Sequence, residues 1–182
     1  QSGSSKILKN MNRNHDLKKY LNILDKLKKK KKNIKFSSDF IIAYPSETEK
    51  DFKETIDLMK NVKFINSYSF LYSPRPGTPA ADFELIDTKI AKKRLAIFQS
   101  ISDEIKKNYR KNLLNTKATV LFENKIKNED EYFGRDEYFN SVIVKSNQNL
   151  IGKTLEVIIN KFNHNTLFGD ICLQNQQKNF AA

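Results

Sequence analysis

"FSSDFIIAYPSETEKDF", residues 36–52, decides the fold, because a strand pattern leads directly into the start of a helix. Residues 36–44 are rich in aromatic and β-branched side chains, and Pro45 ends the run. Thr48 followed by Asp51 three residues later resembles a capping box, which starts a helix. The stretch therefore predicts one strand, a short loop and one helix.

The segments on both sides extend this alternation of helix and strand. Residues 14–32 predict a helix that Asn14 or Asp16 caps. Residues 65–73 predict the next strand, and residues 87–114 predict a long helix. The side chains that recur at helical spacing in the long helix are Ile90, Arg94, Ile97, Ile101 and Ile105. Those that recur in the helix after Thr48 are Phe52, Ile56 and Met59. This order favours parallel βα units.

The helical period ends near residue 113, and short strand-like runs follow, separated by polar or glycine-containing turns. These runs are residues 117–126, 131–146, 153–162 and 166–173. Strands spaced in this way predict a small all-β barrel. The predicted fold class is therefore α/β followed by all-β. The predicted domains are the C-terminal portion of an α/β barrel (1–112), a β-barrel (113–175) and a tail (176–182).

The composition restricts the classes of partner and compartment. The formal net charge of +12 favours an anionic partner, either nucleic acid or a phospholipid surface, although a general richness in Lys and Asn explains it as well. No run of 18 apolar residues is present, and the lone Cys172 gives no disulfide framework. His15 and His164 have no partner at metal-ligand spacing. We expect a cytoplasmic monomer without a membrane span or a metal ligand set.

Backbone control is concentrated in "FLYSPRPGTPAAD", residues 70–82, which holds three of the four prolines and Gly77. In parallel βα folds ligands bind at the carboxyl ends of the strands, and this loop follows such an end. Two prolines flank Arg75, so ordering the loop costs less entropy. Arg75 either contacts an RNA phosphate or base, or pairs with an acidic residue. Asp39, inside an apolar strand, either faces a site or is paired in the core.

Three blocks of the chain resemble consecutive blocks of the radical-SAM methylthiotransferases. They are "QSGSSKILKNMNR" (1–13), "SSDFIIAYPSET" (37–48) and "YSFLYSPRPGTPAAD" (68–82). The runs "FGRDEYFNSVIV" (133–144) and "LIGKTLEVII" (150–159) resemble the TRAM domain, the RNA-binding module of that family. The arginine-proline block favours the branch that modifies tRNA over the branch that modifies a ribosomal protein.

The resemblance implies a TIM-like radical-SAM barrel, a TRAM β-barrel and an enzyme that methylthiolates an isopentenyl-adenosine beside the tRNA anticodon. It also implies S-adenosylmethionine and two [4Fe–4S] clusters as cofactors, and tRNA as the partner. The cluster-binding cysteines of the family are absent from this chain. We therefore expect a C-terminal portion that is inactive alone. The alternatives are a stand-alone, non-catalytic RNA-binding protein and a methylthiotransferase for a different tRNA adenosine.

The resemblance also implies roles for individual residues. Gln1 and Asp39 are expected to bind the cofactor's ribose, and Arg13 its methionyl carboxylate. The residues expected to contact RNA are Arg75, Lys117, Arg135, Lys145 and Lys153, with Tyr138 or Phe139. The lysine run of residues 28–32 is interpreted as a solvated helix end. The family usually has Gly-Phe-Pro-Gly-Glu-Thr where this chain has "AYPSET", so Ala43 and Ser46 replace two glycines.

Overall fold

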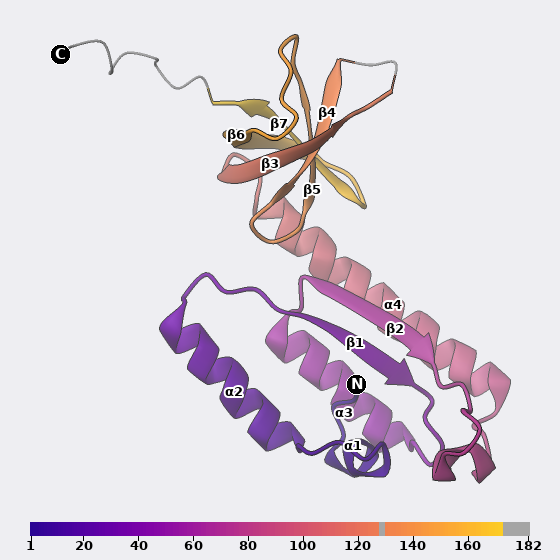
Figure 1. Ribbon diagram of the computed structural model, residues 1–182. Coiled ribbons are helices and arrows are strands. Elements are labelled where there is room, and N and C mark those ends of the chain that lie inside the picture. The colour runs from indigo at the N-terminus through magenta and orange to yellow at the C-terminus, as the bar shows by residue number, and fades with distance from the viewer. Residues whose placement is uncertain (128–129, 173–182) are drawn as a thin grey trace. The chain divides into compact units, whose positions relative to one another are not determined.

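The computed structural model describes residues 1–127 and 130–172, which form two compact units that divide after Lys106. The first unit contains α1 (Ser5–Asn10), α2 (Leu17–Lys30), β1 (Ser37–Ile42), α3 (Glu49–Val62), β2 (Asn66–Leu71), the 3-10 helix η1 (Pro79–Asp82) and most of α4 (Thr88–Lys111) (Figure 1). The second unit contains β3 (Lys117–Lys125), β4 (Glu131–Asp136), β5 (Ser141–Lys145), β6 (Thr154–Phe162) and β7 (Thr166–Ile171). The predicted order of α/β followed by all-β is confirmed.

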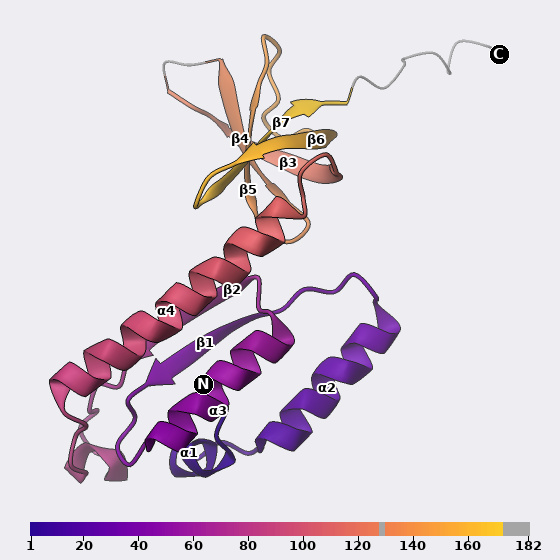
Figure 2. The same cartoon turned by 180° about the vertical axis from the view of Figure 1, so that it is seen from behind.

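Strands β1 and β2 are parallel, as the βα pattern predicted, with Asp39 opposite Tyr68 in the register. One face of this pair carries Phe40 and Ile42, which are buried in a core shared with α3 and α4. Helix α4 passes behind β2 in Figure 1 and in front of it in Figure 2, which is seen from the other side. The opposite face of the strands carries Asp39 and Tyr68, and both are exposed.

The helix starts follow from the predicted caps. Asp16 is the N-cap of α2, where its carboxylate accepts a hydrogen bond from the Lys19 backbone N–H at 2.7 Å. Thr48 and Asp51 form the predicted capping box at the start of α3. The three apolar residues predicted for one face of α3, namely Phe52, Ile56 and Met59, are all buried.

The predicted apolar stripe of α4 is wrong in part. Ile90 and Ile97 are 47% and 39% exposed, whereas Ala91, Arg94 and Phe98 are buried. The Phe98 ring lies 4.8 Å from the Phe40 ring, so this bulky side chain fills the core beneath β1 and directs that face of the helix inward. Arg94 of the predicted stripe is buried, and Ile101 and Ile105 pack against the core, so the prediction fails only for Ile90 and Ile97.

The second unit is a closed barrel with the strand order β3-β4-β5-β7-β6. The β5–β7 pair is parallel, and the other neighbouring strands are antiparallel. The run of residues 131–146 forms two strands, β4 and β5, joined by a turn. The side chains that are entirely buried in the barrel core are Val120, Phe122, Val142, Val157, Ile159 and Leu167.

Candidate cofactor site and nucleic-acid interface

The segments that follow the strand ends of the first unit meet at one edge of the sheet. The Gln1 carbonyl accepts a hydrogen bond from the Ile41 backbone N–H at 3.0 Å. Just beyond the strands, the Tyr44 and Tyr72 rings are 5.0 Å apart and nearly perpendicular. Tyr44 donates a hydrogen bond from its hydroxyl to the Asn10 carbonyl at 2.8 Å. The loops after β1 and β2 and the chain start are thus held together.

Two of the residues predicted to bind the cofactor, Arg13 and Asp39, lie within electrostatic range of the third, Gln1. The Arg13 guanidinium and the Asp39 carboxylate both act electrostatically, with opposite sign, on the backbone nitrogen of Gln1. Both side chains are therefore within electrostatic range of Gln1, and the Ile41 hydrogen bond holds Gln1 beside β1. Asp39 is exposed and has no ion pair among the described residues, so it is available to a ligand rather than paired in the core. An exposed guanidinium and carboxylate fit a ligand that carries a carboxylate and a diol.

A network of small polar side chains fixes the chain start against α3. The Gly3 N–H donates to the Thr55 hydroxyl at 2.9 Å, and the Ser4 hydroxyl donates to the Asp51 carboxylate at 2.7 Å. Burial favours a raised pKa for Asp51, but the hydrogen bonds from Ser4, Thr48 and Lys6 outweigh it and lower the pKa well below its usual range. This network, which positions Gln1, was not predicted from the sequence.

A buried ion pair beneath the loop after β1 was likewise not predicted from the sequence. The Arg94 guanidinium donates to the Glu47 carboxylate and to the Glu47 backbone carbonyl, each at 2.9 Å. The same carboxylate accepts the Ala43 N–H at 3.3 Å, which closes the loop on itself. Burial raises the pKa of Glu47 to about 7, although Arg94 and the Ala43 N–H both lower it. An arginine within the apolar stripe of α4 was the available signal, because a buried guanidinium requires an acidic partner.

Ala43 and Ser46, where the family usually has glycine, adopt left-handed backbone conformations with φ values of 59° and 70°. Residues with a Cβ atom rarely adopt this conformation, whereas glycine adopts it without steric cost. Backbone conformation by itself therefore accounts for glycine at both positions. Here the Ser46 side chain accepts a hydrogen bond from the Asn10 amide at 3.1 Å, which compensates in part.

We expect the double variant Ala43→Gly/Ser46→Gly to be more stable than the wild type by about 1 kcal/mol. Relief of two left-handed conformations outweighs the extra freedom that glycine gives to the unfolded chain. Hydrogen exchange of amides in β1 and α3 measures this change in the first unit. The control is Ala91→Gly inside α4, which should destabilise by about 1 kcal/mol. A double variant less stable than the wild type contradicts the interpretation.

The residues of this chain do not fit an iron–sulfur cluster. Ligation requires several thiolates, and the only cysteine, Cys172, directly follows β7 in the barrel unit. The described residues contain no group of three or more His, Cys, Asp or Glu side chains that would hold a metal ion. In the described part of the chain, no helix is long and apolar enough to cross a membrane.

Arg75 is exposed in the loop after β2, and no ion pair to it is found among residues 1–127 and 130–172. Among the described residues, Arg75 is therefore not paired with an acidic residue, which was the alternative that the sequence left open. Gly77 has a φ of 79°, as a tight turn requires, and the Thr78 hydroxyl donates to the Arg75 carbonyl at 2.8 Å. The loop thus presents a free guanidinium to solvent.

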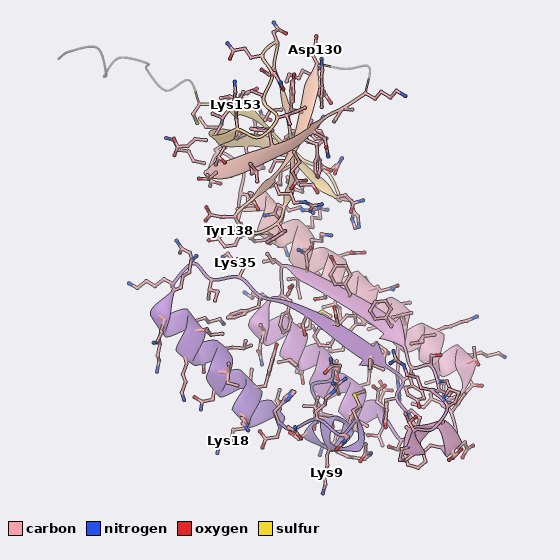
Figure 3. The ribbon with its side chains drawn as sticks, in the orientation of Figure 1. Lys9, Lys18, Lys35, Asp130, Tyr138 and Lys153 are labelled. Carbon is pink, nitrogen blue, oxygen red and sulfur yellow. The ribbon has the colours of Figure 1, made fainter. Side chains whose placement is uncertain are left out.

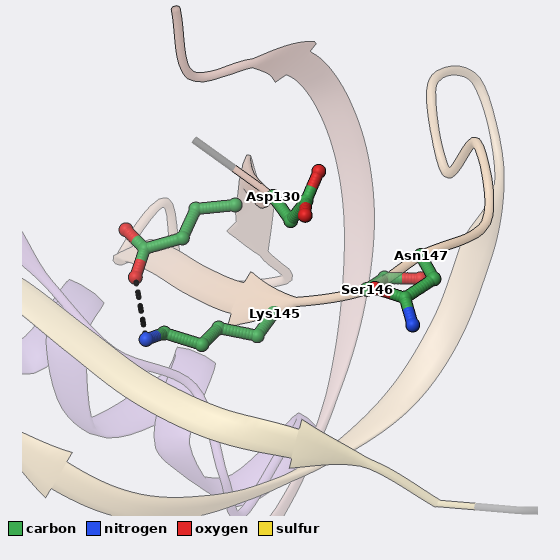
Figure 4. A pocket seen from close by; sticks show the side chains of 5 residues that line it. Asp130, Lys145, Ser146 and Asn147 are labelled. Carbon is green, nitrogen blue, oxygen red and sulfur yellow. Dashed lines mark ion pairs between the residues drawn. The ribbon is translucent and has the colours of Figure 1, made fainter. Parts of the chain in front are cut away.

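Three of the four cations nominated in the barrel face an acidic side chain. Lys117 pairs with Glu156 at 3.1 Å and Arg135 with Glu123 at 3.5 Å. Lys145 lies 3.7 Å from Glu131, in a pocket that Asp130, Glu131, Ser146 and Asn147 also line (Figure 4). Each of these pairs is at least partly exposed, so a phosphate competes with a carboxylate for the cation.

Lys153 is exposed and has no ion pair in the described ranges. It lies well away from Tyr138, which is at the other end of the barrel (Figure 3). Phe139 is 75% exposed, because the Asp136 carboxylate accepts the backbone N–H of Tyr138 and of Asn140, each at 2.8 Å, and so fixes the turn that carries it. The structure thus distributes the nominated barrel residues over several surfaces.

Most of the excess positive charge lies outside the barrel. Residues 1–106 carry 22 of the 33 Lys and Arg residues but 13 of the 21 Asp and Glu residues, which leaves a net charge of +9 there and +3 in the rest of the chain. Lys28–Lys30 form the last turn of α2, the helix end expected from the sequence. Their ammonium groups complement the helix dipole there.

The comparisons with known proteins agree with this architecture. Residues 1–59 match the family model of the radical SAM superfamily, and residues 112–172 match that of the TRAM domain. One segment of the chain is thus similar to radical SAM proteins and another to TRAM domains.

The similarity to complete proteins is more specific. The chain is 51% identical over 180 residues to the tRNA-2-methylthio-N(6)-dimethylallyladenosine synthase of Pelagibacter ubique, and 44% identical over 173 residues to that of Rickettsia typhi. The alignments cover 98% and 94% of this chain, but the chain spans only 40% and 39% of the length of these relatives. The resemblance to radical-SAM methylthiotransferases of the tRNA branch is thereby confirmed.

Proposed function

We propose that this chain is one part of a cytoplasmic radical-SAM enzyme that methylthiolates N6-dimethylallyladenosine in tRNA. The observation that carries the proposal is the 51% identity over 98% of the chain to a synthase with that name. The juxtaposition of Gln1, Arg13 and Asp39 supports it. In the assembled enzyme, Arg13 binds the methionyl carboxylate of S-adenosylmethionine, and Gln1 and Asp39 bind its ribose. When bound, that cofactor supplies the radical chemistry.

The remainder of the enzyme is needed to test this activity, because the residues of this chain do not fit the clusters. We would join the chain to the rest of the Pelagibacter ubique synthase and reconstitute the fusion anaerobically. Mass spectrometry of tRNA nucleosides should detect the 2-methylthio product, and Asp39→Ala should weaken cofactor binding by about 1–3 kcal/mol. A fusion that yields no product, while the intact Pelagibacter synthase does, contradicts the proposal.

We further propose that the barrel and the Arg75 loop contact tRNA mainly through phosphates. Barrel binding should therefore weaken steeply with salt, and each phosphate-contacting cation removed should lower the log–log salt slope by about 1. We expect this reduction for Arg135→Ala, measured by fluorescence anisotropy with labelled tRNA over a salt series. Glu123 lies 3.5 Å from Arg135 and competes with the phosphate for this guanidinium. The slope reduction for Arg135→Ala at neutral pH should therefore not exceed about 1.

The control for this prediction is Lys31→Ala, which directly follows the basic last turn of α2 and is expected to have less effect. If Lys31→Ala lowers the slope more than Arg135→Ala does, the RNA surface is the lysine-rich end of α2, where much of the excess charge lies. That outcome would overturn the placement of tRNA on the barrel. If the chain binds tRNA tightly but the fusion forms no 2-methylthio product, the results instead favour the alternative function, a non-catalytic RNA-binding protein.

A further inference from the structure

Three apolar side chains form a row on the outer face of the barrel. Strands β4, β5 and β7 contribute Phe133, Ile143 and Phe168, which we call the outer row, and all three are half-buried. Phe133 is opposite Ile143 in the β4–β5 register, and Ile143 is opposite Phe168 in the β5–β7 register. Residues opposite each other on paired strands share a face, so the three side chains lie side by side.

The outer row lies outside the barrel core. Its neighbours along the strands, such as Tyr132, Val142 and Val144, are buried in that core, and successive residues of a strand point to opposite faces. Each of the five described barrel strands is paired on both sides, so no further strand is needed to complete this face. A strand face that turns away from the core normally carries polar side chains. An apolar row there indicates contact with an apolar or planar group from outside the barrel.

A cation lies over the ring at each end of the outer row. The Arg135 guanidinium carbon is 5.4 Å from the centroid of the Phe133 ring. At the other end Lys161 of β6 is opposite Phe168, and its ammonium nitrogen is 6.0 Å from the centroid of that ring. Attraction between ring and cation restrains these long side chains. Arg135 also pairs with Glu123, whereas no ion pair to Lys161 is found in the part of the chain that the structure describes.

We propose that the outer row stacks on unpaired bases of the tRNA, while Lys161 and Arg135 contact the phosphates beside those bases. This inference rests on the proposed function and makes it more specific, because it assigns single-stranded or looped nucleotides to the barrel. Only unpaired bases offer a ring face that an aromatic side chain can cover. A cation at each end of the row suits a polyanion, whereas an apolar protein segment would leave both cations without a partner.

The test compares the binding of single-stranded and duplex RNA by the 182-residue chain. We would titrate a labelled RNA of about 12 nucleotides without self-complementarity, alone or annealed to its complement, and determine both Kd values by fluorescence anisotropy. Contacts to phosphates alone favour the duplex, because its phosphates are more closely spaced. Stacking on one base favours binding by about fivefold or more, so the wild type should bind the single strand at least about fivefold more tightly than the duplex.

Two variants separate stacking from simple packing. Phe168→Leu keeps an apolar side chain but removes the ring, so it should weaken single-strand binding by about fivefold or more. Phe168→Tyr keeps the ring and should bind like the wild type. Lys161→Ala, at an exposed position, should lower the log–log salt slope for the single strand by about 0.7, whereas both Phe168 variants should leave that slope unchanged. The matched control is Ile151→Ala, an exposed apolar residue between β5 and β6, which should change neither Kd nor slope.

The inference is wrong if the wild type binds the duplex as tightly as the single strand, or if Phe168→Leu binds the single strand like the wild type. The same variants in the fusion with the Pelagibacter segment show whether RNA reaches the outer row in the longer protein. Variants that weaken binding by the chain but not by the fusion would mean that another segment covers the row, which also overturns the inference. If only the inference fails, the fusion still forms the 2-methylthio product; if only the proposed function fails, the single-strand preference is present but no product forms.

Discussion

Replacement of Arg94 by alanine is expected to destabilise the first unit by about 3–5 kcal/mol. The variant leaves the Glu47 carboxylate, whose side chain is 0% exposed, without its cationic partner. It also removes the hydrogen bond to the Glu47 carbonyl that holds the loop after β1. Hydrogen exchange of the amides in β1 and α3 reports this loss for the first unit separately. An effect below about 1 kcal/mol would contradict the role assigned to the pair.

The pH dependence of this effect gives a sharper test. The pKa of Glu47 is raised from 4.5 to about 7 in the folded protein, so the stability linked to its proton is fully present below about pH 4.5 and is lost as the pH rises through 7. Without Arg94, ionisation costs more, so the destabilisation should be larger at pH 8.5 than at pH 5.5. The matched control Glu47→Gln/Arg94→Ala has no carboxyl and should not show this pH dependence. Equal pH dependence in both variants would exclude Glu47 as its source.

Replacement of Gly134 by alanine is expected to destabilise the barrel by about 3 kcal/mol. A Cβ atom at this position of β4 would overlap the Leu121 carbonyl oxygen and lie 2.7 Å from Val120 Cγ1. Both neighbours belong to β3, which is hydrogen-bonded to β4, so neither can withdraw without opening the barrel. Urea unfolding followed by the exchange of barrel amides measures the change.

Gly152→Ala is the control for this prediction. Its Cβ atom would meet nothing within 4 Å, and the only cost is its φ of 77°. We expect a loss of about 1 kcal/mol there. If Gly134→Ala were no more harmful than Gly152→Ala, the close approach of β3 and β4 would not limit the barrel.

Local sequence signals determined much of the fold. The Thr48–Asp51 capping box, Asp16 at the start of α2 and the apolar face of α3 are set by residues at most one or two helical turns apart. The alternation of strands and helices then required a parallel pair, and the run of short strands required a closed β structure. These features could be predicted because each depends on backbone geometry and spacing within a short segment.

For the candidate site, the resemblance to radical-SAM methylthiotransferases implied Gln1, Arg13 and Asp39, and the sequence predicted that Arg75 lies on a loop at a strand end. The structure places the Arg13 and Asp39 charges within electrostatic range of Gln1, whose carbonyl accepts a hydrogen bond from Ile41 of β1. Such proximity depends on contacts between distant parts of the chain, which spacing along the chain does not encode.

Only the tertiary structure decided which side chains face inward and which charges are neutralised. The stripe of α4 was misplaced because Ile90, Ala91, Ile97 and Phe98 are all apolar, and only the space beneath Phe40 selects Phe98. The Glu47–Arg94 pair joins residues 47 positions apart. Three barrel cations likewise pair with carboxylates on neighbouring strands that are distant in the sequence, namely Lys117, Arg135 and Lys145. Packing and ion pairing are properties of three-dimensional neighbours, whereas caps, turns and hydrophobic periods are properties of neighbours in sequence.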